Sequence, residues 1–358
     1  MKRIIISVTN DLVSDQRVNK VANTLSNAGF SVLLVGRRFS ESVKLSPRNY
    51  STYRLKMFFQ KGFLFYLEYN IRLCLFLLTK KSDILLSNDL DTLCANYFVS
   101  KIRKIKLVYD SHELFTELPE LIGRTFKKKI WLFMEKFFLR RISNAYTVSN
   151  SIARYYKDKY DINMSVIANY PVARKINSQF VLKNKKIIIY QGAINKDRGI
   201  DLMIESMLYV NAELHLIGDG DLLLEMREHV ERLNLGHKVF FKGKVAFGDL
   251  FDITKEADLG LSFEDNTCLS YRYALPNKIF DYINAEVPIL ISDLPEFRCV
   301  LKSYKVGAIL ASRDIQSVAR QINQLLSIPK STWSAELLKA KKEYDWLIQE
   351  KKLLSFFY

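Results

Sequence analysis

The sequence predicts an α/β fold built from two doubly wound domains in series. Continuous apolar runs at residues 4–8 and 107–109 are typical of central parallel strands that are covered on both faces. Segments with helical spacing of apolar residues follow such runs, and the same succession restarts at Lys186. A chain of 358 residues is long enough for two domains, each with its own core.

The first half repeats a unit of strand, polar loop and helix. After the strand at 4–8 we expect a loop at 9–15, a helix at 16–27 and a strand at 32–35. The loop lacks a GxGxxG pattern, so a standard dinucleotide site has no support. Polar residues also end the later strands, expected at 84–86, 107–109, 145–148 and 165–168. Because parallel strands bring such ends to one edge of a sheet, this is the expected binding edge. Its polar candidates include Asn10, Asp11, Asp89 and Asp91.

The second half has the same pattern, with strands expected at 186–190, 214–217, 239–242, 259–262 and 288–292. A polar and basic linker at 172–186 separates the halves. We therefore expect an N-terminal domain at 1–172, a C-terminal domain at 173–334 and a helical segment at 335–358. Two such domains in series are expected to form a ligand-binding cleft between their strand edges.

The net charge of +16 lies entirely in the first half of the chain. Residues 1–180 contain 30 Lys and Arg against 14 Asp and Glu, whereas residues 181–358 contain 24 of each sign. A basic face for an acidic partner is therefore expected in the first half. Nucleic acid, anionic lipid and a phosphorylated acceptor all fit that charge. The apolar core runs and the strand-edge loops give a nucleic-acid partner little support, so none is predicted.

Cysteine usage and hydropathy favour a cytoplasmic protein. The four cysteines lie apart with no CxxC spacing, so neither a zinc site nor a disulfide framework is indicated. The chain starts directly with a strand, which leaves no room for a signal peptide. The most apolar helix, near residues 63–78, contains Glu68 and Arg72 and is expected to be too short to span a bilayer.

Residues 261–296 contain the most informative binding pattern. A strand ending near Ser262 is followed by a polar loop, and a helix opens around Pro276. The free first-turn amides of that helix can hold an anion, and Lys278 adds positive charge. Asp281, one turn further on, is placed to accept hydrogen bonds from a diol such as ribose. The combination suits a phosphorylated sugar nucleotide, and the alternative is an ordinary solvated helix.

Two further strand-end segments carry candidate ligand-binding residues. Lys196 and Arg198 lie in a glycine-flanked loop, which suits a diphosphate clamp, although a solvated loop is the alternative. His112 is one of four histidines, and its place at a strand end favours a hydrogen bond to a sugar hydroxyl over a solvated role. Asp89 and Asp91 form a D-x-D sequence, for which helix-capping carboxylates are the favoured interpretation, so no metal site is predicted.

Residues 126–141, FKKKIWLFMEKFFLRR, are expected to form an amphipathic helix with basic residues beside an aromatic face. Core packing with solvated lysines is the favoured interpretation. Contact with an anionic membrane surface is the alternative. The apolar helix, extended to residues 63–81, would belong to the same basic and aromatic face.

In this order, the segments resemble a GT-B-fold glycosyltransferase of the retaining family 4 type (glycosyl transferases group 1). The resemblance spans nearly the full length and is carried by SDQRVNKVANTLSNAGFSVLLVG, DILLSNDLDTLCA, VYDSHELFTELPE, YQGAINKDRGID, LIGDG, FKGKV and ALPNKIFDYINAEVPILISDLPE. It implies two Rossmann-like domains facing across a cleft, with the segment at 335–358 packing back toward the N-terminal domain. It also implies sugar transfer with retained anomeric configuration and usually no metal. The acceptor would bind mainly the N-terminal domain and the donor nucleotide the C-terminal one.

The resemblance assigns roles to single residues. Asp281 would hold the nucleotide ribose, Arg198 would bind the donor diphosphate, and His112 would approach the transferring sugar. Lys278 and the amides near it would assist, and Val245 would lie beside the base. The expected catalytic residues are His112, Arg198 and Lys278; the donor-binding residues are Asp281, Lys196, Gly192, Asn277, Tyr273, Val245 and Gly218; the acceptor-side residues are Asn10, Asp11, Asp89 and Asp91.

Three positions depart from the family pattern: Tyr273, Ala193 and Glu286, of which Glu286 stands where the family usually has a small residue before Val287. Tyr273 stands where the family has the first Glu of its E-x7-E motif, so contacts to the donor sugar hydroxyls would come from another residue, with Glu264 and Asp265 as candidates. Ala193 stands where the family often has an Arg, which leaves Lys196 as a substitute.

We expect a cytoplasmic, metal-independent glycosyltransferase, with attachment to the inner face of a membrane as a further option. It would transfer a sugar from a UDP- or GDP-sugar to a saccharide or lipid-linked acceptor in surface polysaccharide or glycolipid biosynthesis, without a cofactor. A non-catalytic subunit that binds a nucleotide sugar and a sugar-nucleotide 2-epimerase of the same fold are the alternatives. The subunit would bind donor without turnover, and the epimerase should carry more carboxylates in the cleft for proton transfer.

Overall fold

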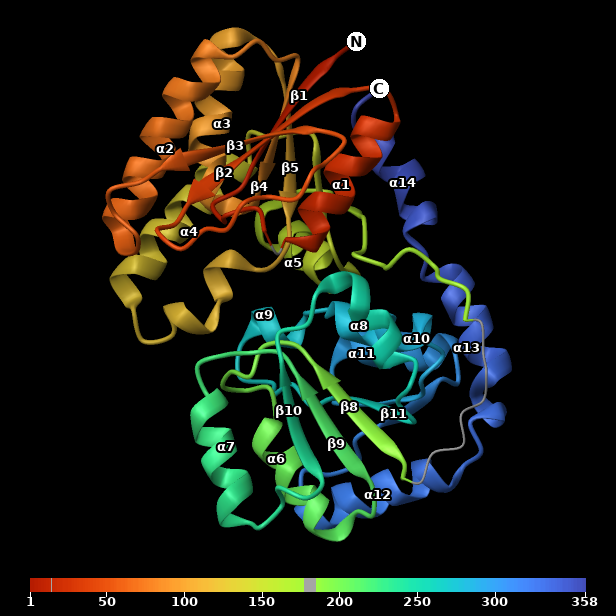
Figure 1. Ribbon diagram of the computed structural model, residues 1–358. Helices are drawn as coiled ribbons and strands as arrows, with labels where there is room; N and C mark the ends of the chain where they lie inside the picture. Colours follow the sequence, from red (N-terminus) through yellow and green to blue (C-terminus); the bar gives the residue numbers. More distant parts are fainter. Residues whose placement is uncertain (14, 177–184) are drawn as a thin grey trace. The chain divides into compact units, whose positions relative to one another are not determined.

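The computed structural model describes residues 1–13, 15–176 and 185–358 (Figure 1). It divides into two compact units, of which the first contains Met1–Asn169 together with Gln349–Tyr358 and the second contains Tyr170–Ile348. Each unit has one parallel sheet with helices on its two faces. The predicted α/β class with two Rossmann-like domains is confirmed.

The sheet of the first unit has the strand order β3-β2-β1-β4-β5-β6-β7, and all neighbouring strands are parallel. In β1, Ile4 pairs with Val32 on one side and with Ile84 on the other. Its strands are β1 (Arg3–Ser7), β2 (Ser31–Arg38), β3 (Ser51–Lys56), β4 (Ile84–Asn88), β5 (Lys106–Ser111), β6 (Ala145–Thr147) and β7 (Ser165–Val166).

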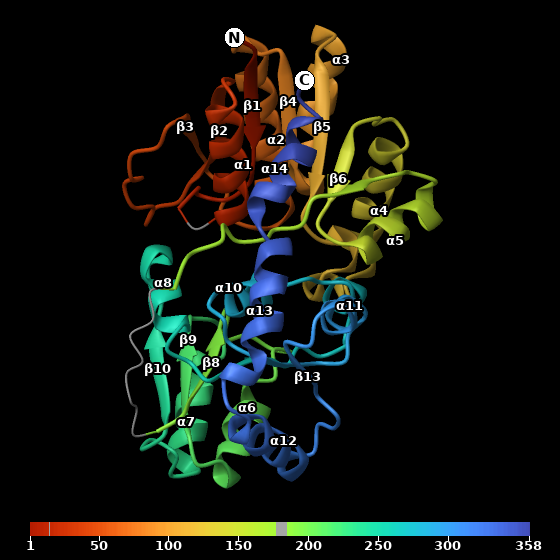
Figure 2. The ribbon, with the colours of Figure 1, turned by 90° about the vertical axis from the view of Figure 1, so that its right-hand side faces the viewer.

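The helices of the first unit form two layers. Tyr69 and Leu73 of α2 share a core cluster with Ile5 and Leu85 of the central strands, and α3 packs against both α2 and α4. In Figure 2, α1 lies in front of the sheet and α2 lies behind it. The helices are α1 (Gln16–Asn27), α2 (Gly62–Thr79), α3 (Asp89–Arg103), α4 (Thr125–Leu139) and α5 (Asn150–Tyr160), with short 3-10 turns at η1 (Phe115–Glu117) and η2 (Pro119–Leu121).

Helix α2 differs from the expectation for residues 63–78. It has 18 residues and is long and apolar enough to cross a membrane by length and composition, the one helix in the described part of the chain that meets this test. The sequence-based expectation that this helix is too short is therefore corrected. The Glu68–Arg72 pair lies within the helix, with 2.6 Å between Glu68 Oε1 and Arg72 Nε.

The second unit has a six-stranded parallel sheet in the order β10-β9-β8-β11-β12-β13, among the residues that are described. Its strands are β8 (Ile187–Gln191), β9 (Glu213–Ile217), β10 (Val239–Gly243), β11 (Leu259–Ser262), β12 (Ile289–Ile291) and β13 (Gly307–Ile309). Because successive residues of a strand point to opposite faces, Ile188 and Ile189 belong to different core clusters.

Each face of this second sheet has its own set of helices. One cluster contains buried residues of α6 (Ile200–Ser206), α7 (Leu223–Arg232) and α12 (Ile315–Ser327). The other contains those of α10 (Asn277–Asn284), α11 (Pro295–Ser303) and α13 (Ser331–Glu343), with α8 (Phe247–Thr254) at its margin. The short α9 (Leu269–Arg272) and the 3-10 turn η3 (Met207–Tyr209) complete the unit.

The boundary between the units lies near the expected one. The first unit ends at Asn169, whereas the sequence placed the boundary after residue 172. Val172 and Arg174 already bind the second unit, because the side chain of Asn284 donates to the Val172 carbonyl and accepts from the Arg174 amide. Of the expected linker at 172–186, residues 177–184 lie outside the described residues.

The C-terminal segment is divided between the units. Leu337 and Ala340 of α13 are buried in the second unit, because these residues, three apart on one helix face, pack in the cluster of α10. The segment at 335–358 was expected to pack toward the N-terminal domain as a whole. Only the part from Gln349 onward belongs to the first unit, and this part begins within α14 (Trp346–Leu354). There, Gln349 Oε1 accepts from the Ala168 amide at 3.1 Å, and Glu350 accepts from Thr24 at 2.6 Å.

Tyr282 of α10 holds two central strands of the second unit together. Its hydroxyl donates to the Leu261 carbonyl of β11 at 3.1 Å and accepts from the Gln191 amide at the end of β8. Its ring lies against Gly260, where an added Cβ would come within 2.5 Å of the ring carbon Cδ2. A side chain at position 260 would therefore push α10 away from the sheet.

We predict that Gly260→Ala lowers the free energy of unfolding by about 1–3 kcal/mol, since the buried ring has no space to move into. Urea unfolding of the purified protein measures this change. Gly236→Ala is the matched control, because an added Cβ at that position meets nothing within 4 Å. Equal unfolding midpoints for the two variants would contradict the close packing of α10 on β11.

Candidate functional site

Two glycine loops lie side by side beyond the second sheet. Gly192 follows β8 and Gly218 follows β9, both with positive φ (142° and 140°). A Cβ on Gly218 would come within 1.8 Å of the Gly192 carbonyl oxygen, so only glycine allows this approach. The predicted binding edge of the second unit is therefore built from closely packed backbone.

Arg198 is presented by the loop that connects β8 to α6. The loop turns through Asp197 and Gly199, both with positive φ, and the Asp197 carbonyl accepts from the amide of Asp265 at 3.0 Å. The Arg198 guanidinium lies over the ring of Tyr271, 4.4 Å from its centroid. Its Nε atom is buried and has no hydrogen-bond partner among the described residues. Arg198 thus has one buried guanidinium donor that no described residue satisfies.

Glu264, two residues beyond β11, is a buried carboxylate between two cations. It is 1% exposed, and its Oε1 lies 2.6 Å from Lys278 Nζ and 3.7 Å from Arg198 Nη1. Ser262 Oγ donates to its Oε2 at 2.6 Å. Burial by itself would raise the pKa of Glu264, but the adjacent Lys278, Ser262 and Arg198 lower it below its ordinary value. Glu264 is therefore the counter-ion that gathers both cations.

Lys278 reaches this carboxylate from the second residue of α10. Its ammonium lies 4.3 Å from the centroid of the Tyr190 ring. An added Cβ on Gly192 would lie 3.4 Å from Lys278 Cε, so the lysine runs beside the glycine loop. The side chain is almost completely buried, and its charge depends on Glu264 for compensation.

Asp281 lies on the same helix and is held by the end of β8. Gln191 Nε2 donates to Asp281 Oδ2 at 2.9 Å, and Thr254 donates to Gln191 Oε1, also at 2.9 Å. Because its amide oxygen is occupied by Thr254, Gln191 presents its NH₂ group to the carboxylate. Asp281 is half-buried, so part of it remains open to a ligand.

The other donor-side candidates surround this group less tightly. Asn277 is the first residue of α10, and Tyr273 follows the last residue of α9 and is half-buried. Lys196 is exposed. Val245 comes two residues after β10, which is two strands away from β8 in the sheet.

The two carboxylates considered as substitutes for the missing glutamate at position 273 are both in ion pairs. Glu264 is the counter-ion of Lys278 and Arg198, and Asp265 Oδ1 lies 2.7 Å from Arg313 Nη2. Their negative charges therefore position cations of this chain. This arrangement could not be predicted from the sequence, because the residues involved come from four separate segments.

The binding edge of the first unit contains an ion network around His112, in which Asp110 and Arg17 are buried and His112 and Asp89 are half-buried. Its Nδ1 lies 3.2 Å from Asp89 Oδ2 and its Nε2 lies 3.1 Å from Asp110 Oδ2. The His112 amide also donates to Asp89 Oδ1 at 2.8 Å. Asp110 in turn binds Arg17 through two hydrogen bonds of 3.1 and 2.8 Å.

The charges of neighbouring side chains shift the pKa values of His112 and Asp110. Burial would lower the pKa of His112, but Asp89 and Asp110 outweigh it and raise that pKa to about 9. Burial would raise the pKa of Asp110, but Arg17 and His112 lower it to about 2. At neutral pH, His112 is therefore an imidazolium between Asp110 and Asp89, and burial raises the pKa of Asp89 to about 7.

The D-x-D residues have different surroundings. Asp89 begins α3 with a positive φ of 55° and binds His112, whereas Asp91 is buried and accepts from Thr9 Oγ1 at 2.5 Å. Burial and the charge of Asp89 raise the pKa of Asp91 to about 7. In the part of the chain that is described, no three His, Cys, Asp or Glu side chains form a group that would hold a metal ion.

Asn10 and Asp11, the remaining acceptor-side candidates, shape their own loop. Asn10 donates to Asp15 Oδ2 at 2.6 Å and accepts from the Leu12 amide, while Asp11 accepts from the Val13 amide. Leu12 has a positive φ of 72°. Both polar side chains therefore stabilise a tight turn, and both are half-buried at the binding edge.

Comparison with known protein families places both halves of the chain. Residues 173–343 match the family described as Glycosyl transferases group 1, and residues 16–170 match Glycosyltransferase Family 4. The chain is a GT-B-fold relative of the group 1 glycosyltransferases. No curated protein matches its sequence.

Solved structures of similar fold match this chain over nearly its whole length. Sucrose-phosphate synthase from Thermosynechococcus elongatus is 16% identical with a TM-score of 0.80, and the match covers 100% of this chain and 98% of that one. Anabaena Alr3699/HepE in complex with UDP-glucose is 14% identical with a TM-score of 0.76, covering 100% and 99%. A glycosyltransferase from Rickettsia africae ESF-5 is 14% identical with a TM-score of 0.74, covering 99% and 98%. At these identities the likeness shows the fold.

Sequence reasoning missed several residues that build the binding edges of the two units. Arg17, Gln191 and Tyr271 were assigned no role, although each contacts a predicted site residue or its counter-ion. Asp110 carried the clearest signal, because a carboxylate that ends a continuous apolar strand must find a partner once it is buried.

We predict that His112 titrates near pH 9 in NMR spectra of its imidazole protons and that Asp89→Asn moves this midpoint toward the ordinary value of about 6.5. Because the folded pKa is raised, the stabilisation is fully present below about pH 6.5 and is lost as the pH rises through about 9, which amounts to up to about 3 kcal/mol. Asp83→Asn, an exposed carboxylate paired with Arg3, is the control and should leave the His112 midpoint in place. An unchanged midpoint in Asp89→Asn would refute the network.

We predict that Glu264→Gln lowers the free energy of unfolding by about 3 kcal/mol, since it leaves Lys278 buried without a counter-charge. Urea unfolding at pH 7 measures the loss. Glu336→Gln, which changes an exposed pair with Lys339, should leave the unfolding midpoint almost unchanged. Because the pKa of Glu264 is lowered, the wild type keeps this advantage above about pH 4.5 and loses it as the pH falls further.

Proposed function

We propose that this chain transfers a sugar from a nucleotide-diphosphate sugar to a hydroxyl group of a saccharide or lipid-linked acceptor, with retention of anomeric configuration. The observation that carries the proposal is the pair of cations, Arg198 and Lys278, that Glu264 gathers next to Asp281 at the binding edge of the second unit. Surface polysaccharide or glycolipid biosynthesis is the proposed setting.

The chemistry of the donor matches this group of residues. A diphosphate carries negative charge that Arg198 and Lys278 can neutralise, assisted by the amides at the start of α10. The open part of Asp281 can accept from the ribose hydroxyls. Anabaena Alr3699/HepE, which is similar in fold, is described in complexes with UDP and with UDP-glucose, and this supports a UDP-sugar, with a GDP-sugar as the second choice.

In the proposed reaction, the bond between the anomeric carbon and the β-phosphate oxygen breaks, and its electron pair stays on the phosphate. Arg198, Lys196 and Lys278 stabilise that developing charge. The acceptor hydroxyl oxygen bonds to the anomeric carbon on the same face, and its proton passes to the leaving phosphate. The protein's own cations take the place that a divalent metal would have, so we propose a metal-independent enzyme without a cofactor.

The first unit would serve the acceptor in this proposal. His112, held as an imidazolium, adds positive charge at the binding edge, and Asp89 and Asp91 add carboxylate oxygens for hydroxyl groups. Cys74, Cys94, Cys268 and Cys299 are free thiols, which suits the reducing cytoplasm. We therefore propose a cytoplasmic location, where nucleotide sugars are available.

A non-catalytic subunit that binds a nucleotide sugar is the second candidate. It is favoured by Tyr273, which stands where the family has a glutamate, and by Glu264 and Asp265, whose charges are taken up by cations. Such a subunit would keep the diphosphate clamp and lose the contacts to the donor sugar. Turnover of the donor separates the two candidates.

We predict that one of UDP, GDP and dTDP binds in calorimetric titration and that Arg198→Ala weakens this binding about 10- to 100-fold, the usual effect of losing a charge-assisted hydrogen bond. Lys302→Ala, an exposed lysine on α11, is the control and should bind like the wild type.

Hydrolysis of the matching nucleotide sugar, followed by chromatography, then distinguishes the enzyme from the subunit. Binding with hydrolysis supports the transferase, and binding without any turnover favours the subunit. If none of the three nucleotides binds, the diphosphate clamp is refuted.

A further inference from the structure

Helix α2 is apolar on two opposite faces. Its inner face, with Phe65, Tyr69, Leu73 and Leu77, is buried in the core of the first unit. Its outer face carries large apolar side chains that are 41–60% exposed: Phe63, Leu64, Leu67, Ile71, Leu75 and Leu78. A helix that is hydrophobic all round normally has a partner on both sides. The exposed outer face of α2 therefore indicates that an apolar partner binds there.

Helix α4 presents a mixed outer stripe. Phe126, Lys129, Phe133, Lys136 and Arg140 recur at spacings of three and four, so they share one face of the helix. All five are exposed, and Phe126 and Phe133 are 75% and 70% exposed. Apolar rings that alternate with long cationic side chains are typical of a helix that lies at a membrane surface.

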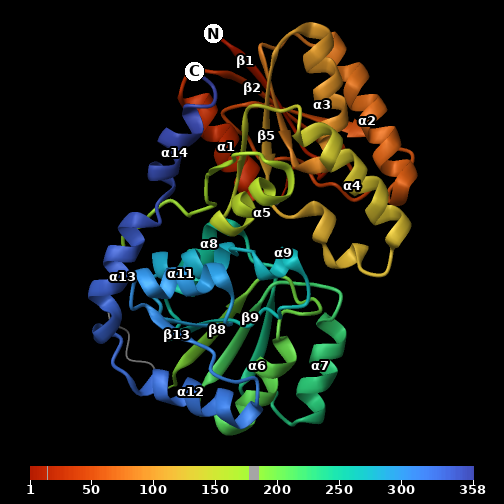
Figure 3. The ribbon, with the colours of Figure 1, turned by 180° about the vertical axis from the view of Figure 1, so that it is seen from behind.

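Helix α3 joins these two faces into one layer. It packs against both α2 and α4, and Phe98 and Ile102 of α3 are exposed. Figure 1 and Figure 3 show α2, α3 and α4 together on one side of the first unit. We call the exposed residues of α2, α3 and α4 the outer helical face. An exposed apolar surface that extends over three helices is unusual for a protein that has no partner there.

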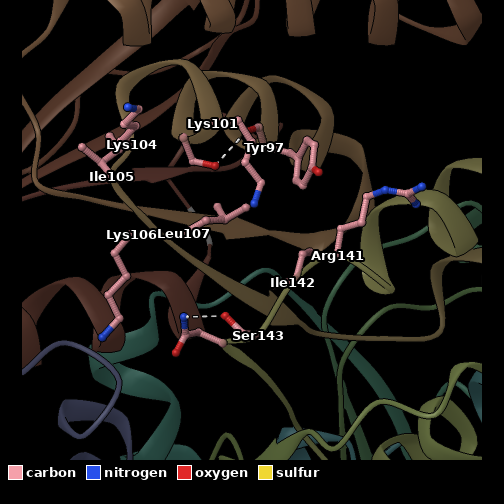
Figure 4. Close-up of a pocket in the computed structure, with 11 residues that line it drawn as sticks. Tyr97, Lys101, Lys104, Ile105, Lys106, Leu107, Arg141, Ile142 and Ser143 are labelled. Atoms are coloured by element: carbon pink, nitrogen blue, oxygen red, sulfur yellow. Dashed lines mark hydrogen bonds between the residues drawn. The ribbon is translucent and has the colours of Figure 1, made fainter.

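The charges around the outer helical face are positive. Lys80 and Lys81 follow α2, Lys101 and Lys104 end α3, and Arg141 follows α4. Arg103 donates to the Leu77 and Lys80 carbonyls, which brings the ends of α2 and α3 together. Figure 4 shows Lys101, Lys104 and Arg141 around one pocket at this end of the layer. The acidic residues of the layer add little, because Glu68 is paired with Arg72 and Glu135 is buried.

We infer that the outer helical face docks on an anionic phospholipid bilayer. The apolar side chains of α2 and α4 would enter the boundary between headgroups and acyl chains, and the basic side chains would bind lipid phosphates. The helix would lie along the surface, because Tyr69 and Leu73 on its inner face are fully buried and the Tyr69 hydroxyl donates to the Val8 carbonyl. This inference goes beyond the proposed function and does not depend on it.

Sedimentation with lipid vesicles tests the inference with the full chain. We expect binding to vesicles of phosphatidylcholine with about one-third phosphatidylglycerol and at least tenfold weaker binding to phosphatidylcholine alone. The triple change Leu67→Gln, Ile71→Gln and Leu75→Gln should weaken binding to anionic vesicles at least tenfold, as should Lys129→Glu with Lys136→Glu. High salt should also release the protein, since it screens the charges.

Matched controls lie in the second unit. Leu208→Gln, Leu224→Gln and Leu338→Gln change three exposed leucines, and Lys302→Glu with Lys305→Glu makes the same charge change, so both sets should sediment like the wild type. Urea unfolding of every variant checks that the fold is retained.

Equal binding to neutral and anionic vesicles would overturn the electrostatic part of the inference, and binding that survives the triple change would overturn the docking face. A dimer in light scattering that the triple change dissociates would show that a second copy of the chain covers the face, and would also overturn the inference.

Discussion

A carboxylate that is buried at the end of a central strand or just beyond it organises the binding edge of each unit. Such a group is tolerated only when a cation reaches it, so the helices and loops that carry the cations are held in place. In the first unit, Asp110 is the penultimate residue of β5 and draws in Arg17 from α1. In the second unit, Glu264 follows β11 and draws in Lys278 from α10 and Arg198 from the loop after β8. The polar edge of each sheet is thus assembled by the need to compensate one charge.

The same need explains why the two edges differ chemically. The guanidinium of Arg17 donates to Asp110 and to the Ile167 carbonyl, so the first unit presents His112 and carboxylates to a ligand. In the second unit two cations share one carboxylate, and positive charge is left over. An excess of positive charge suits a diphosphate, and a mixture of carboxylates and an imidazolium suits hydroxyl groups. The proposed division of labour between donor and acceptor would follow from this difference in local charge.

Regular elements were predictable where burial imposes a pattern. The helix expected at 16–27 coincides with α1, and the strand expected at 4–8 lies within one residue of β1, because both have one strongly apolar face or run. The edge strands β3 and β13 were missed, since β3 mixes polar and apolar residues and β13 has only three residues. Ion pairs such as Arg17 and Asp110, which are 93 residues apart, could not be predicted, because a single sequence does not show which distant charged residues meet in the fold. Asp281, Lys278 and Arg198 could be proposed as ligand-binding residues because their spacing to a helix start or a glycine loop is local.

The return of the chain to the first unit has a consequence for synthesis. Residues 349–358 are made only after the whole second unit has been synthesised, yet they cover α1 through Glu350 and place the buried Phe357 beside Phe30. During translation, the apolar surface of the first unit that residues 349–358 cover is therefore exposed while the second unit is being synthesised. The nascent first unit has to wait for its last helix, and chaperones that bind apolar segments have that interval in which to act.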